Sequence, residues 1–236
     1  GVCRSLWNWI TLGGQNLISV GTTLKYYIER GGNYYDITPI RLTTIAGAVT
    51  FAATNGSSTL TITNVSHGAV AGDFVTFSGA VTLGGNITAA VLNQEYEIST
   101  VLTDDTYTIA AKDTSDVTVT ANALDTGNGG AAVIGTYQIN TGAATAVPFS
   151  GWWGLGTWGY SSASSSAIRL WSQSNYGEDL VFAYRGGPIF YWDASTGTSV
   201  RGKIINALNY PLSEDVPSLV NIVSVSDIYR FVFAFG

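Results

Sequence analysis

Hydrophobic and polar residues alternate with a period of two in several short runs along the chain. Clear examples are Thr59-Leu-Thr-Ile-Thr63, Phe74-Val-Thr-Phe77, Tyr96-Glu-Ile98 and Thr106-Tyr-Thr-Ile109. This alternation places every second side chain on the same face, which is typical of half-buried β-strands. We therefore predict a strand over each run, and a small β-barrel or β-sandwich built from these strands.

A second pattern repeats outside this region. Gly14-Gln-Asn-Leu-Ile-Ser-Val-Gly21 leads into Leu24-Lys-Tyr-Tyr-Ile28, and Gly177-Glu-Asp-Leu-Val-Phe-Ala-Tyr184 leads into Ile189-Phe-Tyr-Trp-Asp193. Each unit pairs a strand with an aromatic return strand. The segment Asp227-Ile-Tyr-Arg-Phe-Val-Phe-Ala-Phe-Gly236 matches the first strand again, about 50 residues after the second copy, which is the spacing of propeller blades. The repeat predicts buried apolar residues at Leu17, Ile18, Val20, Leu180, Val181, Ala183, Val232 and Ala234.

Composition changes between these two patterns. The stretch from Thr44 to Thr141 is rich in Thr, Ala, Val and Gly and interrupts the repeat. We expect propeller blade segments at 1–43 and 142–236, with an inserted small β domain at 44–141. Because the third repeat lacks its return strand, we also expect the chain to be a fragment of a longer protein.

The overall composition supports an all-β fold. Charged residues make up 11% of the 236 residues, against roughly 25% in an ordinary soluble domain. Gly, Ser, Thr and Asn replace them, and Met is absent. These residues, with Val, Ile and the aromatic residues, form strands and turns. The fold class that we predict is a partial β-propeller with four-stranded blades and an inserted small β-barrel or sandwich domain.

Charge and cysteine content exclude several classes of protein. The net charge is −6, from 16 acidic and 10 basic residues, and there is no basic run of the kind that grips phosphates. The single cysteine, Cys3, cannot form an internal disulfide. No apolar run reaches the ~18 residues that a membrane-spanning helix needs.

The segment Gly151-Trp-Trp-Gly-Leu-Gly-Thr-Trp-Gly-Tyr160 combines a tight backbone with large flat side chains. It predicts either a loop packed against a neighbouring molecule or a plug between blades. Low charge and seven tryptophans leave apolar surface that a monomer hides poorly. We therefore expect a closed homo-oligomeric ring, with candidate interface residues Trp152, Trp153, Trp158 and Tyr160.

The two flanks resemble a known group of proteins. The segments Trp7-Asn-Trp9, Tyr26-Tyr-Ile-Glu-Arg-Gly-Gly-Asn-Tyr-Tyr-Asp-Ile-Thr-Pro-Ile40, Arg169-Leu-Trp-Ser-Gln-Ser-Asn-Tyr-Gly-Glu-Asp-Leu180 and Tyr191-Trp-Asp193 look like virion proteins of marine tailed phages. Those proteins are similar to the propeller-bearing tail nozzle and packaged-DNA stabilisation (tail tube) proteins of short-tailed phages.

The resemblance implies a structural subunit of a tail tube, nozzle or portal plug. Such a subunit forms a ring that connects the head to the tail and channels DNA during ejection. Its partners are other copies of itself and tail, adaptor or portal proteins, with transient passage of phage DNA and no membrane span. Its location is the virion, after synthesis in the host cytoplasm.

The segment between the flanks has a resemblance of its own. His67-Gly-Ala-Val-Ala-Gly-Asp-Phe-Val-Thr-Phe77 resembles a small β module named after the first catalytic-cysteine half-domain of ubiquitin-activating enzymes. The catalytic cysteine does not belong to this module, and Cys3 lies outside it. The resemblance therefore implies a fold and no activity.

Two groups of residues contain the residue types of known active sites. Asp125-Thr-Gly127 has the form of an aspartic-protease triplet, in which two carboxylates share a proton. Its neighbours Asn122 and Asn128-Gly-Gly130 favour a turn instead. Ser66, His67 and Asp73 contain the residue types of a catalytic triad, but no Gly-x-Ser-x-Gly elbow accompanies them.

Metal and nucleotide binding have weak signals. Asp104, Asp105, Asp113 and Asp116 surround one predicted hairpin, and carboxylates are ligands for calcium, but their spacing matches no EF-hand. No phosphate-binding glycine motif follows a predicted strand. We therefore predict no cofactor, no metal ion and no enzymatic activity.

Two alternatives to the structural role remain open. One is a receptor- or glycan-binding tail module that stacks sugars on Trp152, Trp153, Trp158, Tyr160 and Trp171. The other is a glycan-cleaving or proteolytic tail protein, although no spacing singles out the pair of carboxylates that a glycosidase needs.

Overall fold

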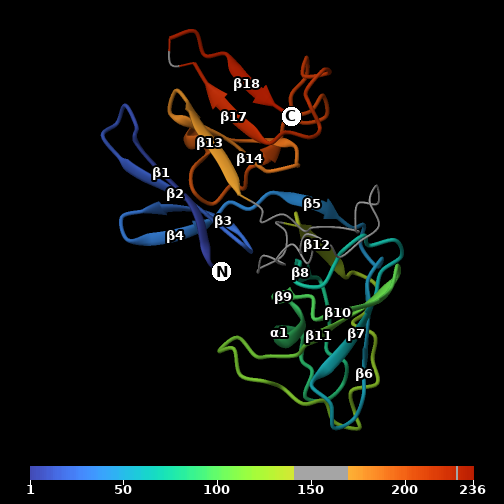
Figure 1. Cartoon of the computed structure of the whole chain (residues 1–236). Coiled ribbons are helices and arrows are strands. Elements are labelled where there is room, and N and C mark those ends of the chain that lie inside the picture. The colour runs from blue at the N-terminus through green and yellow to red at the C-terminus, as the bar shows by residue number, and fades with distance from the viewer. Residues whose placement is uncertain (141–169, 227) are drawn as a thin grey trace, which may run out of the picture. The chain divides into compact units, whose positions relative to one another are not determined.

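The computed structural model describes residues 1–140, 170–226 and 228–236, and these residues are built mainly from β-strands (Figure 1). The chain divides into two compact units: unit 1 comprises residues 1–39 and 141–236, and unit 2 comprises Ile40–Asn140. The helical elements of the described part are one short α-helix, α1 (Ala89–Leu92), and one 3-10 turn, η1 (Ala194–Thr196).

Unit 1 contains two four-stranded antiparallel sheets and one hairpin. In each of them every strand pairs with the next strand in sequence, which makes each sheet a meander. The first sheet consists of β1 (Cys3–Ile10), β2 (Asn16–Thr22), β3 (Tyr26–Arg30) and β4 (Asn33–Asp36). The second sheet consists of β13 (Trp171–Tyr176), β14 (Asp179–Tyr184), β15 (Ile189–Trp192) and β16 (Lys203–Ile204). The hairpin consists of β17 (Ile222–Val225) and β18 (Val232–Phe235).

The sequence explains these strands locally. In β2 the side chains of Leu17 and Ser19 are buried and those of Ile18 and Val20 are partly exposed, as alternation predicts. In β14 four consecutive residues, Leu180 to Ala183, are buried, which is typical of a strand covered on both faces. Gly31 and Gly32 have φ values of 62° and 85° and connect β3 to β4 by a two-residue turn, which requires left-handed backbone at both positions.

The two four-stranded sheets of unit 1 pack against each other through aromatic rings. Tyr26 of β3 stacks on Phe182 of β14, with ring centroids 4.4 Å apart and an angle of 14° between the rings. The ring of Trp171 lies 4.7 Å from that of Tyr26. The Trp171 indole N–H donates to the Thr22 carbonyl oxygen at 2.8 Å, so the polar atom of this buried ring is satisfied. We call these three residues the aromatic seam.

Further contacts extend the seam in unit 1. Trp9 meets Trp192 edge to face at 6.5 Å. The Asp36 carboxylate lies 3.0 Å from the Arg201 guanidinium, and the Gly202 N–H donates to the Ile37 carbonyl oxygen at 2.9 Å. A Cβ atom on Gly202 would lie 2.6 Å from the Phe182 ring, so this approach requires glycine.

The β17–β18 hairpin packs beside the second sheet of unit 1. The Ser172 hydroxyl accepts the Val223 N–H at 2.9 Å, and the Ser174 hydroxyl accepts the Val225 N–H at 3.2 Å. Both bonds join residues that are 51 positions apart. Strand β17 therefore lies beside β13, as β1 also does.

The burial predicted from the repeat is confirmed in part. Leu17, Leu180, Val181 and Ala183 are buried, and Ile18 and Val20 are partly buried. The prediction is wrong for Val232 and Ala234, which are exposed. In the described part of the chain β18 pairs with β17 alone, so its outer edge and its side chains face solvent.

Unit 2 consists of two four-stranded antiparallel sheets around one core. Phe51 and Phe77, from different sheets, meet edge to face at 5.0 Å. Neither sheet closes on itself, so of the two predicted alternatives the sandwich fits this unit and the closed barrel is wrong. One sheet has the order β10 (Thr100–Thr103), β11 (Thr106–Ala110), β7 (Thr59–Thr63), β6 (Thr50–Ala53); the other has the order β5 (Ile40–Thr43), β12 (Ile134–Gln138), β8 (Phe74–Ser78), β9 (Glu95–Glu97).

Polar groups within this core are paired with one another. The hydroxyls of Tyr107 and Tyr137 are 2.9 Å apart, and the Tyr137 hydroxyl donates to the Asn64 side-chain oxygen at 3.0 Å. The Asn64 amide donates to the Ala48 carbonyl oxygen at 3.1 Å. Burial raises the pKa of Tyr137 to about 12, so the network stays neutral at ordinary pH.

The buried position of Leu180 gives a direct test of the repeat. We expect Leu180→Asp to prevent folding of unit 1, because an unpaired charge at a position with 0% exposure costs several kcal/mol. Leu208→Asp is the matched control, since Leu208 is 90% exposed. Thermal unfolding followed by near-ultraviolet circular dichroism compares the two variants. Equal stability of both would contradict the assignment of β14 as a central, doubly covered strand.

Unit 2 gives a second prediction. We expect residues 40–140, expressed alone, to fold and to unfold cooperatively, because both sheets and the whole of their shared core lie within this range. Dispersed amide signals in a two-dimensional NMR spectrum would be the expected result. A collapsed spectrum under native conditions would show that unit 2 depends on the rest of the chain.

Candidate functional site

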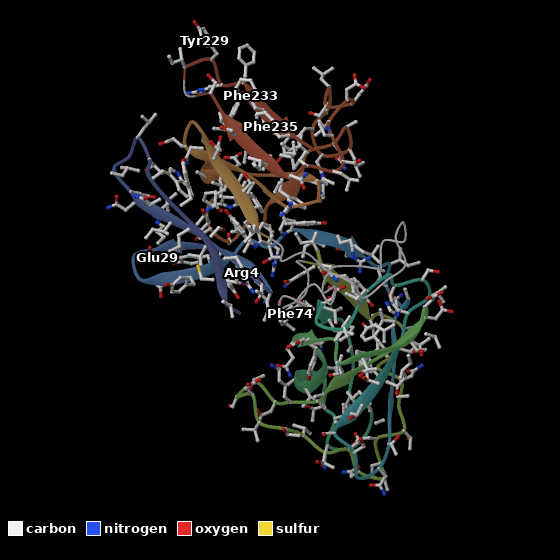
Figure 2. All side chains as sticks on the ribbon, viewed as in Figure 1. Arg4, Glu29, Phe74, Tyr229, Phe233 and Phe235 are labelled. Atoms are coloured by element: carbon white, nitrogen blue, oxygen red, sulfur yellow. The ribbon has the colours of Figure 1, made fainter. Side chains whose placement is uncertain are left out.

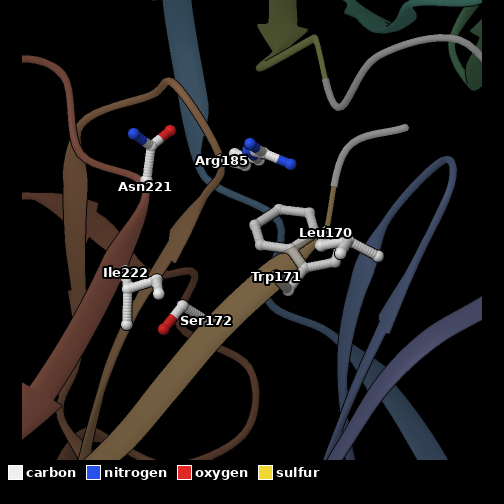
Figure 3. A pocket seen from close by; sticks show the side chains of 6 residues that line it. All are labelled: Leu170, Trp171, Ser172, Arg185, Asn221 and Ile222. Carbon is white, nitrogen blue, oxygen red and sulfur yellow. The ribbon is translucent and has the colours of Figure 1, made fainter. Parts of the chain in front are cut away.

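A groove of about 490 Å³ in unit 1 lies between β13 and β17. Figure 3 shows Leu170, Trp171 and Ser172 on one side and Asn221 and Ile222 on the other, with Arg185 at one end. The turn that carries Arg185 is fixed by the Gly186 N–H, which donates to the Val220 carbonyl oxygen at 2.7 Å.

The chemistry that this groove offers is limited. The described residues that line it comprise one cation, Arg185, one amide, Asn221, the Ser172 hydroxyl and apolar surface. The Ser172 hydroxyl already accepts the Val223 N–H and donates to the Val223 carbonyl oxygen. The described residues that line the groove include no histidine, cysteine or carboxylate, so they provide no base for a serine nucleophile. The groove can hold a side chain or an extended segment.

A second pocket of unit 1 is rich in tyrosine. Tyr176, Tyr191, Ile205, Tyr210 and Ser213 line an open volume of about 250 Å³. The rings of Tyr176 and Tyr191 are 6.4 Å apart at 75°, and those of Tyr191 and Tyr210 are 5.7 Å apart at 84°. The rings therefore meet edge to face. We call this the tyrosine pocket.

Carboxylates adjoin the tyrosine pocket. The Tyr191 hydroxyl donates to Asp179, and the other Asp179 oxygen accepts the Ala194 N–H at 2.9 Å. Burial raises the pKa of Tyr210, and the negative charges of Asp193 and Asp179 raise it further. The pocket thus presents neutral aromatic rings in a negative field, which disfavours an acidic occupant.

The β17–β18 hairpin displays large apolar side chains. Phe233 and Phe235 on β18 are 48% and 55% exposed, and Figure 2 shows them on the hairpin that ends the chain. Tyr229 and Phe231 at the turn before β18 are more exposed still. An apolar face of this kind is typical of an interaction surface.

The predicted interface residues and the predicted sugar-stacking residue Trp171 have different outcomes. Trp152, Trp153, Trp158 and Tyr160 lie outside the described residues. Trp171, proposed as a sugar-stacking platform, is 6% exposed and belongs to the aromatic seam. Its ring packs between Tyr26 and Tyr184, so the proposed stacking role for Trp171 is wrong.

Asp125 is buried and holds a turn together. Its two oxygens accept four backbone N–H groups, those of Gly85, Asn86, Ile87 and Asn122, at 2.8 to 3.1 Å. Desolvation alone would raise the pKa of this carboxyl, but the four donors together lower it below its ordinary value. With both oxygens engaged by the backbone, Asp125 has the environment of a structural carboxylate, which agrees with the turn and not with the protease alternative.

His67 is also engaged by the backbone. Its Nδ1 accepts the Ala69 N–H at 3.0 Å, and its Nε2 lies 3.3 Å from the Thr103 carbonyl oxygen. The Ser66 N–H donates to Asp105, and an Asp73 oxygen accepts the Val70 N–H at 3.0 Å. Both ring nitrogens of His67 thus contact main-chain groups, and the structure gives no support to a Ser66–His67–Asp73 triad.

The acidic residues of the predicted hairpin have separate roles. Asp105 accepts the Ser66 N–H, Asp113 accepts two N–H groups of its own turn, and Asp116 forms an ion pair with Lys112 at 2.6 Å. Within the described ranges no group of three or more His, Cys, Asp or Glu residues has the arrangement of a metal site. The four aspartates, Asp104 included, are therefore not brought together as calcium ligands.

No family profile and no curated protein matches the chain. A solved structure titled "Phage phi92 endosialidase" aligns over 96% of this chain and 31% of that chain, with 16% sequence identity and a TM-score of 0.27. The chain therefore spans about a third of the length of that protein. A TM-score of 0.27 is too low to establish a shared fold or to inform on activity.

No helix in the described part of the chain is long and apolar enough to cross a membrane. The free Cys3 is exposed.

Sequence reasoning missed the tyrosine pocket. Its residues come from β13, from β15 and from the loop after β16, and their convergence depends on sheet pairing. The sequence feature that indicates such a pocket is the aromatic content of the return strand Ile189–Trp192, which by itself predicts only a strand.

The environment of Asp125 predicts a pH-dependent effect of its replacement. A carboxyl with a lowered folded pKa stabilises the fold above its unfolded pKa of about 3.9 and ceases to do so as the pH falls through the folded value. We expect Asp125→Asn to lower the free energy of unfolding of unit 2 by roughly 2–4 kcal/mol at pH 7, with a smaller loss at an acid pH at which the carboxyl is protonated in the folded state as well.

Urea unfolding at both pH values measures this difference. Asp104→Asn is the control, because Asp104 is exposed, and it should leave both values unchanged. An equal loss for Asp125→Asn at the two pH values would contradict the role of the charge.

Proposed function

We propose that this chain is a structural virion protein of a tailed phage. In this proposal it is a tail tube, nozzle or portal plug subunit, built on a β-propeller, that forms a ring connecting the head to the tail and channels DNA. Its partners are other copies of itself and tail, adaptor or portal proteins.

The observation that carries a structural role is the series of stacked meanders in unit 1. Two four-stranded sheets pack face to face through the aromatic seam, and a third begins at β17 with a spacing of 51 residues. Four-stranded antiparallel sheets at this spacing are the units of propellers. Of the described residues that resemble tailed-phage virion proteins, those at 7–9, 26–36, 171–180 and 191–192 lie in the strands and turns of these same sheets.

The exposed apolar surface supports assembly with other chains. Besides Phe233 and Phe235, the surface of unit 1 includes Leu208 and Leu212 at 90% and 97% exposure. Surfaces of this composition are stabilised when a partner covers them. Closed rotational symmetry covers such a face in every copy without open-ended growth.

Glycan or receptor binding is the second candidate, and the tyrosine pocket favours it. Tyr176, Tyr191 and Tyr210 provide aromatic rings, and aromatic faces with nearby carboxylates are a suitable surface for sugars. Saturation-transfer NMR with methyl glycosides tests this candidate. Glycan binding would be favoured if magnetisation is transferred from the protein to a glycoside and if Tyr210→Ala abolishes this transfer.

The structural proposal predicts a ring in solution or in the particle. We expect mass photometry of the full-length protein to show a closed oligomer, and averaged images of the virion to show a ring at the tail. Replacing Trp152 and Trp158 by alanine should shift the population toward monomers by at least about tenfold, because buried tryptophans dominate interface energies. Asp104→Ala is the control, because Asp104 is an exposed, charged residue of unit 2 and not part of the apolar surface described above. A monomer in solution, together with particle images without a ring, would contradict the proposal.

A further inference from the structure

We propose that Asn128 is a site of spontaneous covalent modification. Its side-chain amide reacts with the main-chain nitrogen of Gly129 to give a succinimide, which water opens to isoaspartate and aspartate. The chain has one other Asn-Gly pair, Asn55-Gly56, and the structure makes that pair the slower one. The inference concerns unit 2 alone and does not depend on the virion role proposed above.

The reaction needs no partner other than water. The Gly129 nitrogen loses its proton to solvent base and forms a bond to Cγ of Asn128. The C–N bond of the side-chain amide breaks, and its nitrogen takes a proton from water and leaves as ammonia. Hydrolysis then takes up a water molecule and breaks one or the other C–N bond of the succinimide. Breaking the bond to the main-chain carbonyl carbon gives isoaspartate, and breaking the bond to Cγ gives aspartate.

The first argument is the hydrogen bonding of the two glycine nitrogens. The Gly56 N–H donates to the Ala121 carbonyl oxygen at 2.9 Å, so this bond must break before the nitrogen can lose its proton. The Ser57 N–H donates to the Thr54 carbonyl oxygen at 2.9 Å and closes the same turn. Within the described part of the chain the Gly129 N–H donates to no acceptor. The structure therefore protects the nitrogen of Gly56 and leaves that of Gly129 available.

The second argument is the position of the Asn128 side chain. Its Oδ1 accepts the Gly130 N–H at 3.1 Å. This turn folds the side chain back over the peptide bond between residues 128 and 129, which brings Cγ beside the nitrogen that attacks it. The same N–H stabilises the negative charge that develops on Oδ1 as the new bond forms. Asn128 is exposed, so water and base reach it.

The main-chain contacts of the pair indicate what the modification does to unit 2. The Asn128 carbonyl oxygen accepts the Phe51 N–H of β6 at 3.0 Å, and the Gly129 carbonyl oxygen accepts the Val81 N–H at 2.8 Å. The pair thus joins β6 of one sheet to the segment that follows β8 of the other. The approach is close, because a Cβ atom on Gly129 would lie 2.5 Å from the Phe51 ring.

Isoaspartate is incompatible with these contacts. It adds a carbon atom to the main chain before Gly129, and it converts the carbonyl group that accepts the Phe51 N–H into a free carboxylate. The segment must then shift against a ring that leaves it no space. Aspartate leaves the main chain unchanged. We therefore expect the isoaspartate form of unit 2 to be less stable and the aspartate form to keep the stability of the unmodified chain.

Peptide mapping by mass spectrometry measures both sites in the full chain. Trypsin separates them, because the basic residues of this region are Arg41, Lys112 and Arg169. Peptide 42–112 contains Asn55 and peptide 113–169 contains Asn128, and fragmentation locates the modified residue. In native protein kept at mildly alkaline pH, we expect Asn128 to react roughly fivefold faster than Asn55, the factor that breaking one hydrogen bond imposes. In urea, where neither nitrogen is held, the two rates should be similar.

Variants assign the reaction and its consequence. Asn128→Gln should remain unmodified, because its longer side chain closes a ring far more slowly, and Asn55→Gln is the control that should leave the rate at Asn128 unchanged. Ion exchange separates the modified chains by their added negative charge. Urea unfolding of the isoaspartate fraction should show a lower midpoint than the unmodified chain. Asn128→Asp carries the same charge on an unaltered main chain and should keep the unmodified midpoint.

Equal rates at Asn55 and Asn128 in the native chain would overturn the inference. Faster modification of Asn55 would overturn it too, as would a native Asn128 that stays intact while it reacts in urea. An isoaspartate fraction as stable as the unmodified chain would reject the assigned consequence. None of these results bears on the oligomeric state, so failure here and failure of the virion proposal are distinguishable.

Discussion

The stacking of Tyr26 on Phe182, with Trp171 beside them, is the contact on which unit 1 depends. These residues come from two segments that are separated in sequence by the whole of unit 2. Burial of large aromatic rings supplies the stabilisation, and the bond from Trp171 to the Thr22 carbonyl fixes the register between the sheets. The ion pair of Asp36 with Arg201 and the close approach at Gly202 follow from this registration.

Much of the secondary structure could be predicted from sequence because its causes are local. The alternating runs at Thr59–Thr63 and Thr106–Ala110 are strands, and the repeated segments form corresponding hairpins. Sheet order could not be predicted, because the pairing of β11 with β7 and of β12 with β5 joins residues far apart in sequence. The exposure of β18 was missed for a related reason: alternation shows which residues can be buried, whereas burial itself requires a covering neighbour.

Residues that resemble catalytic groups in the sequence have structural contacts in unit 2. Asp125 and His67 both bind main-chain groups near turns. In a chain with few charged residues, a buried carboxylate or imidazole is an efficient partner for the backbone N–H groups that a turn leaves unpaired. The sequence shows the residue type but not the direction of its hydrogen bonds, so a triplet such as Asp125-Thr-Gly127 suits a turn as well as an active site.

The strands β5 and β12 are adjacent and antiparallel, with Ile40 opposite Gln138. The chain therefore enters and leaves unit 2 at neighbouring positions, which lie about 5 Å apart in paired strands. A module whose two ends are side by side can be shortened, replaced or lost in related chains without a change in the path of the strands of unit 1. Sequence variation among homologues is expected to be greatest within unit 2 and least at the residues of the aromatic seam.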